Sequence, residues 1–301
     1  MTVRPDQPSA TVQQPYESRL ATSADGTEIA YREVGRGPGV VIVHGTMSSA
    51  HNHMELASGL GDVFTIYIPD RRGRGLSGPY PSGYSIATEL EDLAAVVSKT
   101  GARDLFGVSS GGIIALQAAL AMPTIRKVAV YEPPFFRDPS RPAELLERFD
   151  EELGQGRVAA ALITAMKGAE MGPPIFNAMP RWLTERLTKL MLSREDKSGS
   201  GNYVPMRGLA PTLHYDFQLV AEMSGTLEMF AAIPADVLLL GGARSPAFLK
   251  SALDDLELVL PRATRVELPG LDHAASWNED RGGRPRPVAQ ALRAFFTALE
   301  L

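Results

Sequence analysis

The sequence predicts an α/β protein: a doubly wound, mostly parallel sheet of eight strands with an inserted helical cap. Three observations favour this fold class. Short apolar runs rich in Val and Ile alternate with amphipathic segments along most of the chain. Residues 135–230 break this alternation, because helical segments follow one another there without a strand. Finally, 301 residues with 44% hydrophobic and 22% charged content suffice for a sizeable core.

The predicted domain boundaries follow from the same pattern. Residues 1–16 are polar and rich in Pro and Gln, so we expect a flexible arm there. The core should comprise residues 17–134 and 231–301, and the cap residues 135–230. No run resembles a signal peptide or reaches about 18 apolar residues, so we expect a cytoplasmic protein without a membrane partner.

The predicted strands are short apolar runs bounded by turn residues. They cover residues 18–23, 28–34, 40–43, 64–68, 105–108, 127–131, 236–240 and 264–268. The dipeptide Asp25-Gly26 favours a hairpin between the first two strands. The unbroken run at 40–43 is typical of a parallel strand that is buried on both faces.

The predicted helices have apolar side chains at helical spacing. They cover a segment ending near residue 60, and then residues 84–100, 110–122, 143–154, 158–169, 181–192, 215–230, 246–260 and 286–299. Because strands of such a sheet point their carboxyl ends to one edge, we expect the loops that follow them to form the ligand site.

Residues 107–111, Gly-Val-Ser-Ser-Gly, form a Gly-x-Ser-x-Gly pentapeptide between an apolar strand and an apolar helix. In this context Ser109 should occupy a sharp strand-to-helix turn with its hydroxyl exposed. A side chain at Gly107 or Gly111 would collide with neighbouring backbone. The N–H of Ser110, at the positive end of the new helix, should face a developing oxyanion. An ordinary Gly/Ser turn is the alternative interpretation.

A serine hydroxyl becomes a nucleophile only when a base removes its proton, and the usual base is a histidine held by a carboxylate. His273 follows the last predicted strand in the Gly-containing turn PGLDH. That is the expected place for the base in the chain order serine, acid, histidine. A surface histidine is the alternative interpretation.

The acid departs from the commonest arrangement. After the strand at 236–240 the chain reads Gly-Gly-Ala-Arg-Ser, so Ser245 stands where an aspartate is expected. Asp272 adjoins His273, but neighbours in a turn rarely point the same way. Glu132 follows the strand at 127–131 and precedes two prolines that cannot extend it, so we assign Glu132 as the acid that orients His273. A hinge glutamate at the entrance to the cap is the alternative.

The second oxyanion donor is predicted to be the N–H of Thr46, because Gly45 lets the backbone turn toward Ser109. His44 is expected to bond within this loop rather than to act as a base. Structural roles are also expected for His51, His53, Asp70 and Arg72. For the two histidines, the alternative is that they line the mouth of a pocket.

Composition excludes several kinds of chemistry. The net charge of −5 gives no electrostatic footprint for nucleic acid. The absence of cysteine excludes disulfides and thiolates. The five histidines form no metal-binding pattern with carboxylates, and residues 73–75 lack the Gly-x-Gly-x-x-Gly of a phosphate cradle. We therefore expect a small-molecule substrate and no metal, cofactor or nucleic-acid partner.

Five ordered motifs resemble the α/β-hydrolase superfamily over about residues 17–300: DGTEIAYREVG, VIVHGTM, IPDRRGRGLSG, GVSSGG and GLDH. The resemblance implies the α/β-hydrolase fold, with Ser109 as nucleophile, His273 as base and the oxyanion donors named above. Haloalkane dehalogenases place a glutamate after the sixth strand, which supports Glu132. Their nucleophile is an aspartate, as in epoxide hydrolases, so Ser109 argues against both activities.

Three functional hypotheses follow. The first is a carboxylesterase-like serine hydrolase that cleaves an ester, lactone or thioester of a small, largely apolar substrate through an acyl-enzyme. Seven of the eleven methionines lie in the predicted cap, which is typical of an adaptable apolar pocket, although helix packing also accounts for them. The second is a non-hydrolytic enzyme on this fold, for cyclisation, C–C bond cleavage or cofactor-free oxygenation in small-molecule biosynthesis. The third is a ligand receptor without turnover.

Overall fold

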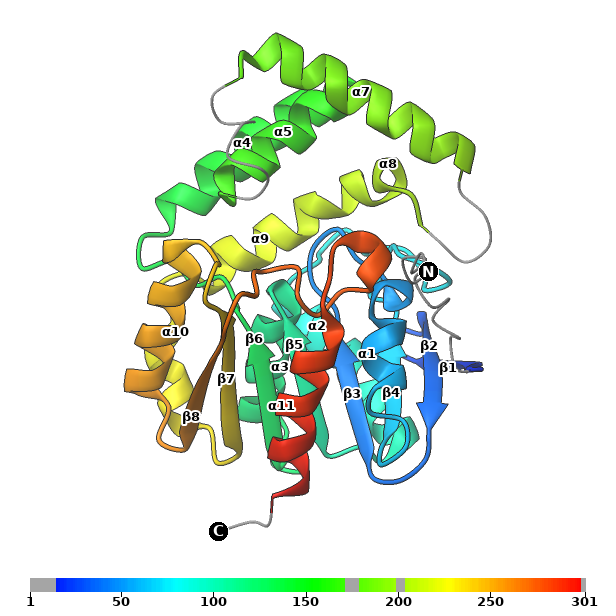
Figure 1. Cartoon of the computed structure of the whole chain (residues 1–301), viewed down its shortest axis with the longest axis vertical. Helices are drawn as coiled ribbons and strands as arrows, with labels where there is room; N and C mark the ends of the chain where they lie inside the picture. Colours follow the sequence, from blue (N-terminus) through cyan, green and yellow to red (C-terminus); the bar gives the residue numbers. More distant parts are fainter. Residues whose placement is uncertain (1–14, 171–178, 199–203, 299–301) are drawn as a thin grey trace, which may run out of the picture.

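The computed structural model describes residues 15–170, 179–198 and 204–298, and its centre is an eight-stranded sheet (Figure 1). The strands are β1 (Glu17–Thr22), β2 (Glu28–Gly35), β3 (Gly39–Val43), β4 (Thr65–Pro69), β5 (Asp104–Val108), β6 (Lys127–Tyr131), β7 (Asp236–Gly242) and β8 (Ala263–Leu268). Their order is β1-β2-β4-β3-β5-β6-β7-β8. The pairs β1–β2 and β2–β4 are antiparallel, and every other pair is parallel. The predicted fold class and strand number are confirmed.

The helices match most of the predicted segments. They are α1 (Met54–Ser58), α2 (Ile86–Thr100), α3 (Ser110–Ala121), α4 (Ser140–Gly154), α5 (Val158–Gly168), α7 (Arg181–Ser198), α8 (Met206–Leu209), α9 (Leu213–Met223), α10 (Ala247–Val259) and α11 (Pro285–Thr297). Short 3-10 turns are η1 (Ala50–His53), η2 (Ala210–Thr212), η3 (Leu227–Ala232) and η4 (Glu279–Arg281). None of the helices within the described ranges has the length and apolar content that a membrane crossing requires.

The single helix predicted over residues 215–230 is wrong. Helix α9 ends at Met223, because Ser224 adopts an extended backbone and Gly225 a positive φ of 75°. The chain then forms the 3-10 turn η3. Gly225 is favourable at such a break because it lacks a Cβ.

Both faces of the sheet are covered, as the unbroken apolar strands predict. On β3, Val41 and Val43 pack into a core cluster with residues of α2 and α3. The alternate residues Val40 and Ile42 pack on the opposite face, with residues of α1 and α11. The alternation follows from the period of two in a strand, so one short run builds two hydrophobic layers.

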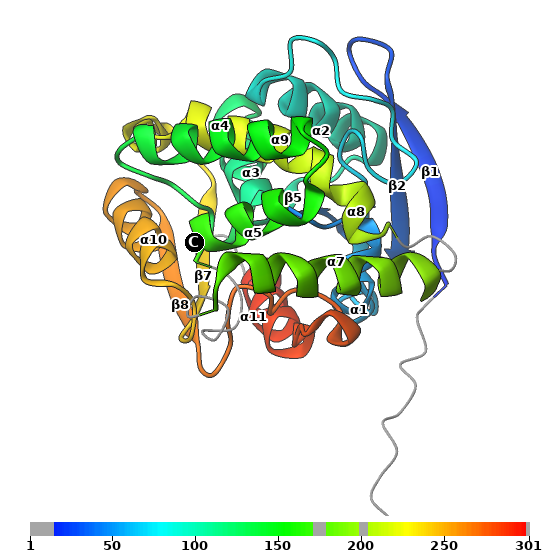
Figure 2. The ribbon, with the colours of Figure 1, turned by 90° about the horizontal axis from the view of Figure 1, so that it is seen from above.

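Helices α4, α5, α7, α8 and α9, here called the helical insertion, lie above the sheet (Figures 1 and 2). They have a hydrophobic cluster of their own, in which Phe149 packs with Leu213 and Phe217 of α9. Leu219 and Val220, also on α9, belong instead to the sheet's core cluster. Helix α9 thus joins the helical insertion to the core. The assignment of residues 135–230 as a separate cap domain stays a prediction.

Candidate active site

The pentapeptide at residues 107–111 forms a sharp turn between β5 and α3. Ser109 has φ 53° and ψ −125°, a conformation that side-chain-bearing residues rarely adopt. The Ser109 N–H donates to the carbonyl oxygen of Tyr131 at 2.9 Å, and its carbonyl oxygen accepts from the Gly112 N–H at 2.8 Å. Such strain costs of order 1–3 kcal/mol and persists where surrounding contacts fix the backbone. The turn is therefore the strained corner that the motif predicts.

Close backbone contacts explain the glycines around Ser109. A Cβ on Gly107 would lie 2.3 Å from the carbonyl oxygen of Gly111, and a Cβ on Gly111 would lie 2.2 Å from that of Val43. A Cβ on Gly45 would lie 2.6 Å from the Val108 carbonyl oxygen. These distances are below any real Cβ contact, so the three glycines allow β3, β5 and α3 to meet at the turn.

Glu132 and His273 contact each other, as the sequence predicts. Glu132 is fully buried at the end of β6, and its Oε2 lies 2.7 Å from His273 Nδ1. Its Oε1 accepts the backbone N–H of Gly242, at the end of β7, at 2.6 Å. With Nδ1 donating to the carboxylate, Nε2 is left as the proton acceptor. This is the geometry that a histidine-orienting acid requires, and the catalytic role itself stays a prediction.

The competing acid positions do not reach the histidine. Asp272 is exposed, and its Oδ1 accepts the Ala274 N–H of its own turn at 3.1 Å. The backbone of Asp272 has a different use, because its carbonyl oxygen accepts the Tyr131 hydroxyl at 2.7 Å. Ser245 Oγ is buried and has no hydrogen-bond partner among the described residues. The turn that carries His273 is thus fixed from β6, the strand that also supplies Glu132.

No hydrogen bond joins Ser109 to His273 in the part of the chain that the structure describes. Ser109 is 9% exposed. Catalytic hydrogen bonds are often long in unliganded proteins and shorten when substrate binds. The two side chains come from the loops after β5 and β8, both at the carboxyl edge of the sheet.

Thr46 and Ser110, whose N–H groups are the predicted oxyanion donors, contact each other through their side chains. Ser110 begins α3, where a helix offers its own N–H groups no acceptor. The Thr46 and Ser110 hydroxyl oxygens are 3.3 Å apart, which joins the two backbone segments. The next residue, Met47, has a positive φ of 52°. The oxyanion role of these groups stays a prediction.

His44 and His53 have structural partners. His44 Nε2 accepts the Arg71 N–H at 3.1 Å and its Nδ1 lies 3.0 Å from the Gly45 carbonyl oxygen, so the ring is neutral. Burial holds the pKa of His44 well below its usual value, and Arg74 and Arg71 lower it further. His53 is buried 3.1 Å from both Ser48 Oγ and the Ser276 carbonyl oxygen, and burial lowers its pKa to about 4.

His51 lies nearer the surface than His53. Its Nδ1 is 3.4 Å from Arg32 Nη1, and burial together with Arg32 lowers its pKa. Asp70 Oδ1 accepts the Ala50 N–H at 2.8 Å, and Arg72 pairs with Asp92 at 2.6 Å. Asp70 and Arg72 therefore hold the loop after β4 in place, as the sequence predicts.

Sequence reasoning missed a buried ionic cluster beside Ser110. Arg71 Nη1 lies 2.7 Å from Asp216 Oδ1, and Arg74 pairs with the second oxygen of the same carboxylate. Arg71 also pairs with Glu89 at 2.7 Å. The Arg-rich loop is visible in the sequence, but Asp216 lies 145 positions beyond Arg71 on α9 and in no motif. No local pattern could have paired them.

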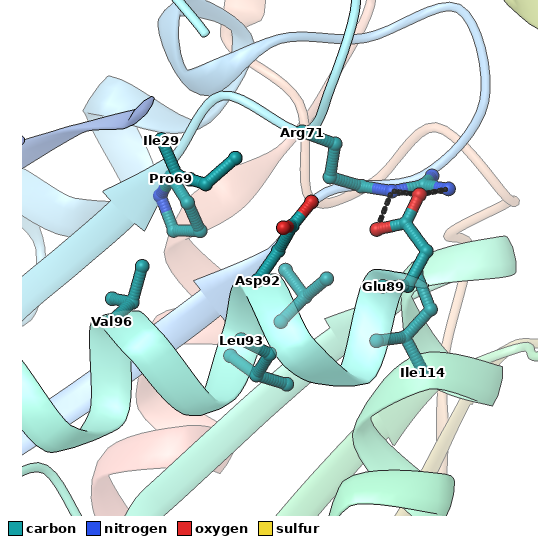
Figure 3. Close-up of a pocket in the computed structure, with 9 residues that line it drawn as sticks. Ile29, Pro69, Arg71, Glu89, Asp92, Leu93, Val96 and Ile114 are labelled. Carbon is teal, nitrogen blue, oxygen red and sulfur yellow. Dashed lines mark hydrogen bonds and ion pairs between the residues drawn. The ribbon is translucent and has the colours of Figure 1, made fainter. Parts of the chain in front are cut away.

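A cavity of about 20 Å³ lies beside this cluster (Figure 3). It is lined by Ile29, Val43, Pro69, Arg71, Glu89, Asp92, Leu93, Val96 and Ile114. Such a volume holds about one water molecule, so it is too small for an organic substrate. Within the described part of the chain, no cluster of three or more His, Asp or Glu side chains could hold a metal ion.

Comparison with known proteins assigns the chain to a family. The sequence profile of the Alpha/beta hydrolase family matches residues 40–291, so the chain belongs to that family. A curated relative, a cis-3-alkyl-4-alkyloxetan-2-one decarboxylase of Shewanella oneidensis, is 25% identical over 265 residues, 83% of this chain and 81% of the relative.

Solved structures agree with this assignment. An α/β hydrolase from Sphaerobacter thermophilus is 32% identical, with a TM-score of 0.75 over 93% of this chain and 100% of that one. A thermophilic esterase from Thermogutta terrifontis, 20% identical, has a TM-score of 0.67 over 93% of this chain and 98% of its own, and shows the fold alone. Together the relatives support an enzyme of the hydrolase class.

Gly107→Ala should destabilise the protein strongly. Its new Cβ would meet backbone atoms of Gly111 and Gly112 at 2.3–2.7 Å, and backbone cannot move aside as a side chain can. We expect the free energy of unfolding in urea to fall by more than about 3 kcal/mol. Gly83→Ala, which introduces a Cβ into open space, is the control and should change it by less than about 1 kcal/mol. Equal effects would show that the turn tolerates a side chain.

Stability should fall in acid because of His53. Its pKa is about 4 in the fold and 6.5 in a free side chain, so the unfolded chain takes up a proton first as the pH falls. The stabilisation is therefore complete above about pH 6.5 and lost progressively toward pH 4, with about 2 kcal/mol lost by pH 5.

Urea unfolding of the wild type and His53→Gln at pH 7.5 and pH 5 measures this loss. His44 titrates in both proteins, so the difference between them isolates His53. The wild type should lose about 2 kcal/mol more than the variant between the two pH values. A parallel loss in both would contradict the buried neutral state of His53.

Proposed function

We propose that the protein is a serine hydrolase that cleaves an ester, lactone or thioester. The observation that carries the proposal is the 2.7 Å contact of Glu132 with His273 beside a strained Ser109 turn. Glu132 accepts the Nδ1–H of the imidazole, which leaves Nε2 as the proton acceptor, and it stabilises the imidazolium when that forms. The full burial of Glu132 strengthens that interaction, because water does not screen it.

The reaction has two steps of the same kind. His273 takes the proton of Ser109 as Oγ attacks the acyl carbonyl, and returns it to the leaving group. Water then attacks the acyl-enzyme with the same base. The N–H groups of Thr46 and Ser110 stabilise the oxyanion in both steps. The positive end of the α3 dipole also stabilises this negative charge.

Methionine packing does not single out a substrate pocket. Met223 is buried in the sheet's core cluster, and Met206 packs within the helical insertion. Met191 and Met229 are exposed, and Met171 lies outside the described residues. The preference for a small apolar substrate is therefore part of the proposal. It is supported by Met47, which follows Thr46 and packs against the apolar cluster of the helical insertion.

A second candidate is a lyase-type reaction on a lactone. It is favoured by the relative that is named as an oxetan-2-one decarboxylase, because an oxetan-2-one is a four-membered lactone. Hydrolysis of such a ring adds water and gives a 3-hydroxy acid, whereas decarboxylation releases CO₂ and an alkene. Analysis of the products from a 3,4-dialkyl oxetan-2-one distinguishes the two.

Ser109→Ala should abolish the activity. We expect the wild type to hydrolyse a short-chain p-nitrophenyl ester and to react with a fluorophosphonate probe at Ser109, as peptide mass spectrometry can locate. The variant should lose the label and at least about 10⁴-fold in kcat. Ser110→Ala, the neighbouring serine, should retain labelling at Ser109. Absence of a Ser109-dependent label in the wild type would refute the proposed function.

Glu132→Gln should lower kcat by about 10³–10⁴-fold with little change in KM, because the amide no longer stabilises the imidazolium. Asp272→Asn is the matched control: it alters the carboxylate next to His273 and should leave kcat within about twofold, as expected of an exposed side chain with a local bond. A larger loss in Asp272→Asn than in Glu132→Gln would reassign the acid.

A further inference from the structure

Asp216 joins the helical insertion directly to Ser110, the first residue of α3. It lies on α9 and is fully buried. Its Oδ1 accepts the Ser110 hydroxyl at 2.9 Å and the Arg71 guanidinium at 2.7 Å. Its Oδ2 accepts from Arg74. One carboxylate of the insertion therefore contacts the residue that follows the proposed nucleophile.

The carboxylate of Asp216 is charged. Burial alone would raise the pKa of Asp216. The neighbouring Arg74 and Arg71 lower it by more, so the net pKa lies below the usual value. A charged carboxylate accepts hydrogen bonds and donates none. The direction of every bond to Asp216 is therefore fixed, and the single hydroxyl proton of Ser110 points to it.

This fixed direction also determines the donor and acceptor roles of the Ser110 and Thr46 hydroxyls. Ser110 Oγ gives its proton to Asp216 and accepts from Arg71 Nη1 at 3.1 Å. The Thr46 hydroxyl, 3.3 Å away, must then be the donor to Ser110 Oγ. Both residues that carry the proposed oxyanion N–H groups thus depend on one carboxylate.

We propose that Asp216 is a positioning residue for the reaction: by holding Ser110, and through it Thr46, it sets the convergence of the two oxyanion N–H groups. The inference rests on the proposed function. Oxyanion stabilisation depends on donors placed about 3 Å from the developing charge, so a small displacement of the loop reduces the rate. Substrate binding, which does not require the oxyanion, should be less affected.

Loss of any buried ion pair also destabilises a protein, so the test needs a control for stability alone. Asp92 supplies it. It is 5% exposed and pairs with Arg72 of the same loop at 2.6 Å and 2.8 Å. It makes no hydrogen bond to the Ser109 turn within the described ranges. Asp92→Asn therefore removes a comparable buried charge without touching Ser110.

Steady-state kinetics compares Asp216→Asn, Asp92→Asn and the wild type on the same p-nitrophenyl ester. We expect Asp216→Asn to lower kcat about 10- to 100-fold with KM within about threefold, less than the loss of a whole oxyanion donor. Asp92→Asn should leave kcat within about twofold even where its melting temperature falls by a similar amount. Equal kcat losses in the two variants would overturn the proposal.

A double-mutant cycle tests whether Asp216 acts through the Ser110 hydroxyl. Ser110→Ala keeps the backbone N–H and every charge but removes the hydroxyl that Asp216 holds. If Asp216 acts through it, Asp216→Asn should lower kcat by less than about threefold in the Ser110→Ala background. Additive losses would show a route that bypasses Ser110. Ser110→Ala also serves as the second variant if Asp216→Asn does not fold.

Amide hydrogen exchange tests the positioning role of Asp216 independently of the proposed function. The amides of residues 109–112 should exchange at least about threefold faster in Asp216→Asn than in Asp92→Asn, whether or not any ester is turned over. A wild type without Ser109-dependent turnover would refute the proposed function alone. Unchanged exchange at these amides would refute the positioning role alone.

Discussion

The backbone turn at Ser109 is the constraint on which the rest of the structure depends. Four described residues other than glycine have a positive φ, and three of them lie at the site: Met47, Ser109 and Glu132. Strain of this kind persists only where the surrounding structure fixes it. The parallel strands β3, β5 and β6 provide that rigidity, and the glycines on either side of Ser109 let their backbones meet. The unfavourable conformations thus fall on Ser109, on Glu132, which contacts His273, and on Met47, which follows Thr46.

The carboxylate that contacts His273 comes from the end of β6, next to the end of β7. Glu132 ends β6, and its N–H donates to the Leu240 carbonyl oxygen of β7 at 3.1 Å, so the two strand ends are adjacent. The chain has Ser245 on the β7 side and Glu132 on the β6 side, where the Gly242 N–H gives the carboxylate a second partner.

Local patterns allowed most of the fold to be predicted, and also the contact between Glu132 and His273. Alternating apolar runs located all eight strands, and the turn residues around Ser109, Glu132 and His273 carry their own signals. The break after Met223 was missed because apolar spacing continues across Ser224 and Gly225. Asp216 was missed for a different reason: a single charge on an amphipathic helix is typical of a solvated face, and only the three-dimensional fold brings it to Arg71 and Arg74.

The contacts of Asp216 also bear on how the protein is made. During synthesis Arg71 and Arg74 leave the ribosome long before residue 216, and both are buried in the finished fold. A nascent chain that ends within α5 would have to enclose two cations that lack one of their counter-charges. We therefore expect the core to stay open around this loop until α9 has emerged. The helical insertion would then be a late step in folding the core, and not a module that can be deleted while both arginines remain.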